Sequence, residues 1–136
     1  MQTCVYEELG HTAEVGMRVG APNAEQLFVC AAQGLYTLAG VAAGEPRLQE
    51  RIMLESFDIE SLLVDWLSEL VYRLDTVGHV YEQISIESWT PTRLTAHLTG
   101  GVAAAPPQRA IKAVTYHGLR VTAGEQGWEA EVYFDI

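Results

Sequence analysis

Residues 58–78, DIESLLVDWLSELVYRLDTVG, carry an apolar residue at nearly every third or fourth position. This spacing predicts an amphipathic helix whose apolar stripe faces a core. Asp58 has the side chain of a helix N-cap, and Gly78 is placed to end the helix. The apolar positions of the stripe are Ile59, Leu62, Leu63, Trp66, Leu67, Leu70 and Leu74.

A second helix is predicted upstream at residues 23–38, NAEQLFVCAAQGLYTL. Its apolar residues recur at the same helical spacing, and Asn23 with Gln26 forms an approximate capping box. Gly40 is positioned to terminate it.

Four other segments alternate between apolar and polar residues, which predicts half-buried strands. Residues 124–127, GEQG, suit the turn of a C-terminal hairpin. Residues 100–108 contain two glycines and two prolines, which predicts a flexible loop. The predicted strand segments are 51–55, 83–87, 94–98 and 129–134.

These elements favour an α+β fold, with a largely antiparallel sheet and two amphipathic helices packed on one face of it. The strands are joined by hairpins, and the regular strand–helix alternation of a parallel sheet is missing. At 136 residues the chain is expected to form a single domain, residues 1–136.

Composition narrows the possible classes of function. The formal net charge of −10 repels phosphate backbones, so tight direct binding to nucleic acid is not expected. Neither a signal peptide nor a bilayer-spanning apolar stretch is visible. Cys4 and Cys30 do not have the spacing of a zinc pair and are too few for a secreted disulfide scaffold, so a reduced cytoplasmic setting is expected.

Three oxygen donors stand out as candidate ligands of a divalent metal ion: Glu14, Asp135 and the carboxylate of Ile136. Calcium and magnesium prefer such ligands. If the strand that begins near Glu14 pairs with the last strand, the three groups could share one ion. His11 could add a ligand or a proton-transfer group, although a histidine in a turn often only bonds to nearby backbone. The carboxylates could equally well just face water.

Lys112 is the only lysine of the chain and lies in the strand-like run 111–118, IKAVTYHG. It could be a structural residue, or a cation beside the acidic groups that meets a phosphate. His117 in the same run has the simple interpretation of a turn histidine. The sequence contains no phosphate-binding loop, nucleophile elbow or paired-cysteine motif, so a self-contained nucleotide-binding or nucleophilic enzyme is not supported.

Four motifs together resemble those of the archease family, in its order and spacing over nearly the whole chain. They are HTAEVG at residues 11–16, LLVDWLSEL at residues 62–70, KAVTYHGL at residues 112–119 and FDI at residues 134–136.

The resemblance implies a non-catalytic protein cofactor of the RtcB-type RNA ligase, which joins RNA ends in tRNA splicing and RNA repair. Archeases promote guanylylation of this ligase and its multiple turnover. By the same resemblance Glu14, Asp135 and Ile136 form a metal site, with calcium first and magnesium or manganese as alternatives. Lys112 matches the functionally important basic position. The family usually has Asp where this chain has Glu14, so the longer side chain can change how the ion is held.

Two other functions remain as alternatives. A general folding modulator or chaperone could also use an acidic surface, and it would be indifferent to Lys112. A metal-dependent hydrolase built on Glu14, His11 and Asp135 ranks last, because no activated nucleophile or complete acid–base pair is visible.

Overall fold

The computed structural model describes residues 4–10 and 13–136. His11, a predicted site residue, therefore lies outside the described residues. In chain order the elements are β1 (Val5–Gly10), β2 (Glu14–Ala21), α1 (Ala24–Ala39), β3 (Ala43–Glu55), α2 (Ile59–Val77), β4 (His79–Thr90), β5 (Arg93–Ala103), β6 (Ala113–Gly124) and β7 (Gly127–Asp135).

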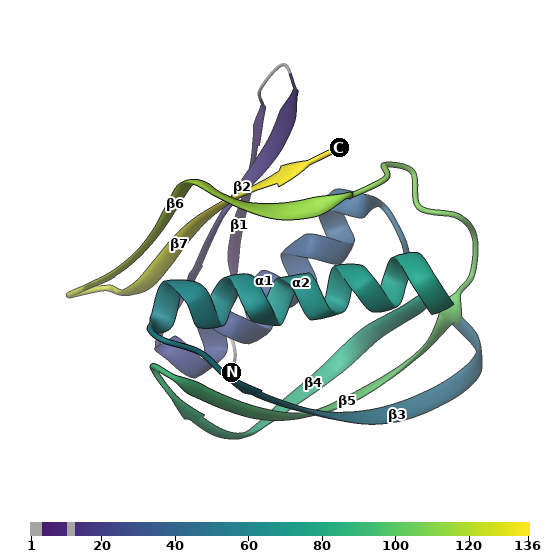
Figure 1. Ribbon diagram of the computed structural model, residues 1–136, viewed down its shortest axis with the longest axis horizontal. Helices are drawn as coiled ribbons and strands as arrows, with labels where there is room; N and C mark the ends of the chain where they lie inside the picture. The colour runs from purple at the N-terminus through teal and green to yellow at the C-terminus, as the bar shows by residue number, and fades with distance from the viewer. Residues whose placement is uncertain (1–3, 11–12) are drawn as a thin grey trace.

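The strands form two antiparallel sheets with the two helices between them (Figure 1). One sheet has the strand order β1-β2-β7-β6, and the other has the order β3-β5-β4. Helix α1 contacts β2 and β7 of the first sheet and β4 of the second, while α2 contacts β6 of the first and β3, β4 and β5 of the second. The α+β class with antiparallel pairing and two helices is confirmed. The structure differs from the expectation in dividing the strands between two sheets.

The reason for the second sheet is visible in α1, which is buried almost all round. A helix with a single apolar stripe needs one covering layer, whereas a helix buried on opposite sides needs two. Small residues such as Ala31, Ala32 and Gly34 let the neighbouring elements approach its backbone closely. Of the residues that the structure describes, neither helix is long and apolar enough to cross a membrane.

The predicted helix ends are confirmed. The side chains of Asn23 and Asp58 each accept a hydrogen bond of 2.8 Å from the backbone N–H three residues later. Gly40 and Gly78 close the helices in the left-handed conformation, with φ of 65° and 70°. Side chains with a Cβ atom are strained at such φ values, so glycine is favoured at both positions.

The predicted strand segments lie inside β3, β4, β5 and β7, and the 124–127 turn joins β6 to β7. The prediction of a flexible loop over residues 100–108 is wrong for its first four residues, because β5 continues to Ala103, whereas residues 104–108 lie outside the helices and strands. A Cβ on Gly100 would lie 1.9 Å from the Val80 carbonyl oxygen, and one on Gly101 equally close to that of Gly44. These glycines therefore allow backbones to pack closely inside a sheet.

The expectation of two reduced cysteines is also wrong. Cys4 and Cys30 form a disulfide, with 5.5 Å between their Cα atoms. The bond joins the residue before β1 to the middle of α1. Sequence spacing did not indicate it, because the two cysteines are 26 residues apart and come together only when β1 packs against α1.

Trp66 connects the two helices at the centre of the core. Its side chain is fully buried, and its indole Nε1 donates a hydrogen bond of 2.9 Å to the Phe28 carbonyl oxygen on α1. The indole N–H of Trp89, by contrast, is buried without a hydrogen-bond partner among the described residues, while its ring packs edge-on against Phe28. The two tryptophans thus differ in whether the indole N–H makes a hydrogen bond, so substitution of each one can be compared.

We predict that Trp66→Phe lowers the free energy of unfolding by about 2–4 kcal/mol, because it leaves a cavity and removes the hydrogen bond that joins the helices. Trp89→Phe should cost about 1 kcal/mol, since it keeps a ring against Phe28 and breaks no hydrogen bond. Urea denaturation of the two variants measures the difference. Equal losses would show that the hydrogen bond contributes nothing to the packing of the helices.

Candidate functional site

The register of β2 and β7 places Glu14 directly opposite Asp135. The next pair along the strands is Val15 with Phe134, and both of these side chains are buried against the helices. Because successive side chains alternate between faces, Glu14 and Asp135 share the opposite, outer face of the sheet. The strand pairing that a shared metal site at Glu14 and Asp135 requires is therefore present.

Two carboxylates in directly opposed positions repel each other. Ile136 follows Asp135 immediately, and in Figure 1 the C-terminus lies beside the β1–β2 hairpin. Within residues 4–10 and 13–136, no three His, Cys, Asp or Glu side chains are close enough together to hold a metal ion. The two carboxylates fit part of a hard-cation site, and a third donor would have to come from the Ile136 carboxylate.

His117 joins this end of the sheet although it belongs to β6, on the far side of β7. Its Nδ1 lies 3.5 Å from Glu14 Oε1. The regular register between β6 and β7 breaks between Thr115 and Arg120, and the Thr115 hydroxyl accepts a hydrogen bond of 3.0 Å from the His117 N–H. This irregularity carries the imidazole toward Glu14, a contact that the interpretation as a turn histidine did not include.

Tyr133 is a residue of this surface that the sequence did not indicate. It pairs with Gly16 on β2, and its ring lies so close that a Cβ on Gly16 would be 2.5 Å from it. A Cβ on Gly118, which has a φ of 75°, would be 2.8 Å from the same ring. The two glycines of the HTAEVG and KAVTYHGL motifs thus make room for the same aromatic ring. The glycines in these two motifs were the sequence feature that could have indicated a large neighbouring side chain.

Lys112 is linked to the acidic end through its backbone. Its N–H donates a hydrogen bond of 2.8 Å to the Asp135 carbonyl oxygen, immediately before β6 begins at Ala113. Its side chain, however, makes no salt bridge within 4.0 Å with Glu14 or Asp135. Lys112 instead lines a groove together with Tyr72 and Asp75 of α2. The expected cation is adjacent to the acidic residues without being paired to them.

This lack of a partner distinguishes Lys112 from the other basic side chains. Every arginine has a glutamate oxygen within 4.0 Å, whereas Lys112 has no carboxylate within that distance in the described part of the chain. Its charge is therefore available to another molecule. The paired arginines are Arg18, Arg47, Arg51, Arg73, Arg93, Arg109 and Arg120.

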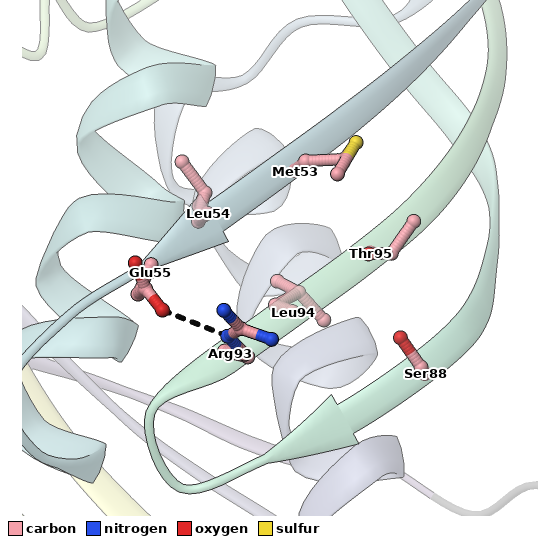
Figure 2. Close-up of a pocket in the computed structure, with 7 residues that line it drawn as sticks. All are labelled: Met53, Leu54, Glu55, Ser88, Arg93, Leu94 and Thr95. Carbon is pink, nitrogen blue, oxygen red and sulfur yellow. Dashed lines mark hydrogen bonds and ion pairs between the residues drawn. The ribbon is translucent and has the colours of Figure 1, made fainter.

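A larger hollow of about 370 Å³ lies on the outer side of the three-stranded sheet (Figure 2). Its charged residues, Arg93 and Glu55, satisfy each other through a contact of 2.7 Å. The other lining residues supply short polar or aliphatic groups. The two charged residues of this hollow therefore have each other as partners, unlike Lys112 near the acidic end of the other sheet, and that end is the stronger candidate site.

Comparison with known proteins identifies relatives of the whole chain. The sequence model of the Archease protein family (MTH1598/TM1083) matches residues 6–136. Protein archease from Methanosarcina barkeri is 33% identical, covering 96% of this chain and 95% of the relative. Protein archease from Methanopyrus kandleri is 31% identical, covering 96% of this chain and 99% of the relative.

Solved structures show the same fold. The solution structure of Methanobacterium thermoautotrophicum protein 1598 superposes with a TM-score of 0.67 at 23% identity, covering 96% of this chain and 98% of the other. The crystal structure of an archease, described as a possible chaperone, from Thermotoga maritima gives a TM-score of 0.71 at 18% identity, with 96% of each chain covered. The chain belongs to the archease family.

Proposed function

We propose that this protein is a non-catalytic cofactor that activates an RtcB-type, GTP-dependent RNA ligase, promoting its guanylylation and multiple turnover in tRNA splicing and RNA repair. The observation that carries the proposal is the strand register that sets Glu14 beside Asp135 and, through one hydrogen bond, next to an unpaired Lys112. These are the positions that the archease resemblance connects with activation of the ligase.

The acidic end is proposed to hold a divalent metal ion through Glu14, Asp135 and the Ile136 carboxylate. Bound there, a cation would offset the repulsion between the two opposed carboxylates. Calcium accepts oxygen ligands in flexible geometry and tolerates the longer Glu14 side chain, whereas magnesium demands a nearly ideal octahedron. Calcium is therefore the first choice, with magnesium and manganese as alternatives.

Charge supports a protein partner over direct RNA binding. The chain carries a net charge of −10, and its arginines are engaged with its own carboxylates. We expect a ligase that binds RNA and GTP to present a basic cleft, and such a cleft attracts an acidic protein. In this arrangement Lys112 meets a phosphate or an acidic group of the ligase.

A chaperone function is the second candidate, because the Thermotoga maritima archease of the same fold is described as a possible chaperone. Such a function would depend on general surface properties. It would not require the unpaired Lys112 or the register of Glu14 with Asp135.

We predict that the protein binds one calcium ion and that Glu14→Gln and Asp135→Asn each weaken this binding at least about tenfold, since each removes a charged ligand. Glu125→Gln, in the β6–β7 turn, removes the same charge at a distance and should leave the affinity unchanged. Isothermal titration calorimetry with calcium, then magnesium and manganese, measures the effect. Equal affinities for all variants would contradict a site at the acidic end.

The function itself is tested by multiple-turnover ligation with the RtcB-type ligase of the same organism, GTP and metal, with and without this protein. We expect stimulation by the wild type and its loss in Lys112→Ala and Asp135→Asn, because both remove charges proposed to act at the ligase. Glu125→Gln should stimulate normally.

Suppression of aggregation of unrelated proteins, measured in parallel, separates the chaperone alternative. Stimulation of the ligase by Lys112→Ala equal to that by the wild type would contradict the proposed role of the site. Absence of any stimulation, together with protection of unrelated proteins, would favour the chaperone.

A further inference from the structure

A groove runs along the C-terminal half of α2, between this helix and the segment that leads into β6. One part, about 230 Å³, is lined by α2 residues from Ser68 to Asp75 and by residues 112–114. A second part, about 200 Å³, adjoins it and is lined by Leu74 and residues Pro107, Ala110 and Ile111. Val71 and Asp75 line both parts, so the two hollows lie next to each other along the helix.

The α2 wall of the groove presents polar and aromatic groups that the fold does not use. Ser68, Tyr72 and Asp75 follow one another at positions i, i+4 and i+7, which places them on one face of the helix. The Tyr72 side chain is exposed, with 63% of its surface accessible. Of the contacts between described residues, no salt bridge involves Asp75 and no side-chain hydrogen bond involves the Tyr72 hydroxyl.

The opposite wall carries Lys112. An unpaired acid and an unpaired base thus face one groove, yet they form no salt bridge with each other within 4.0 Å. The floor between them is apolar, because Val71 is buried and Val114 packs against the core. A partner that complements this groove brings a cation near Asp75 and an anion near Lys112, separated by apolar groups.

An arginine is the cation that fits the α2 wall best. Its planar guanidinium can stack on the Tyr72 ring and at the same time donate paired hydrogen bonds to the Asp75 carboxylate, since these side chains are neighbours on the helix. Lys112 can then pair with a carboxylate on the same segment. A nucleotide fits less well, because Asp75 repels phosphate and the protein as a whole is acidic.

We propose that this groove is the docking site for a segment of the ligase that carries an arginine near an acidic residue, with Tyr72 and Asp75 as its anchors. This inference rests on the proposed function. It adds a surface for recognition of the partner, separate from the metal-binding end on the outer face of the sheet. Tyr72 and Asp75 contribute affinity, whereas the acidic end contributes activation.

The test measures binding of the ligase to Tyr72→Ala and Asp75→Asn by biolayer interferometry, and stimulation of ligation over a range of protein concentrations. We expect each variant to weaken binding at least about fivefold, as truncated anchors of an interface do. The concentration for half-maximal stimulation should rise by the same factor, and maximal stimulation and calcium affinity should stay at the wild-type values.

Phe57→Ala and Glu125→Gln are the matched controls, because Phe57 is an exposed aromatic residue and Glu125 an exposed acid, both outside the groove. Wild-type affinity for both controls, with weakened binding by both groove variants, supports the docking site. Unchanged ligase affinity in Tyr72→Ala and Asp75→Asn, with normal stimulation by the wild type, overturns the docking site and leaves the proposed function standing. A wild-type protein that neither binds nor stimulates the ligase overturns both.

Titration of the isotope-labelled protein with GMP in NMR separates the nucleotide alternative. Chemical-shift changes confined to residues 68–75 and 112–114 would assign the groove to a nucleotide and overturn the proposal. No change at these residues is the expected result.

Discussion

Pairing of the C-terminal strand β7 between β2 and β6 is the constraint on which the functional surface depends. Its register is set by burial, because Val15 and Phe134 must both face the helices. A shift of β7 by one residue would turn Asp135 toward the core, and the same shift of β2 would turn Glu14 inward, where a carboxylate could not be accommodated. The same strand holds Lys112 through the Asp135 carbonyl oxygen and carries Tyr133, against which Gly16 and Gly118 pack. Hydrophobic packing on the inner face of the sheet thereby determines where the charged side chains lie on its outer face.

Electrostatics then separates this surface from the rest of the molecule. On the outer face of the three-stranded sheet, Arg47 and Arg51 of β3 pair with glutamates of β4 across the central strand β5, and Arg93 of β5 pairs with Glu55 of β3. Exposed pairs of this kind add little stability, but they leave that face locally neutral. Within residues 4–10 and 13–136, Lys112 is the one lysine or arginine without a carboxylate partner, and Asp75, like several other acids, makes no salt bridge; both line the groove beside the acidic end. Charged side chains that make no salt bridge within the protein are available to a binding partner.

Much of the fold could be predicted from local signals. The helix ends followed from Asn23, Gly40, Asp58 and Gly78, since a cap depends on a few consecutive residues. The opposition of Glu14 and Asp135 could be expected once two outer motifs were placed on neighbouring strands.

What escaped prediction depends on long-range packing. The disulfide forms only because β1 packs against α1. The glycines of β5 are typical of a loop until the close backbone contacts on both sides are known. The approach of His117 to Glu14 likewise depends on a break in register that no residue pattern marked.

Hydrogen–deuterium exchange of this protein, alone and with the ligase at saturating concentration, tests the account most directly. We expect slower exchange in the complex at residues 14–16, 68–75, 112–118 and 133–135, which form the acidic end and the groove. Exchange in β3, β4 and β5 should be unchanged, because that sheet faces away from the proposed partner. Protection confined to β3, β4 and β5, or no protection anywhere, would contradict it.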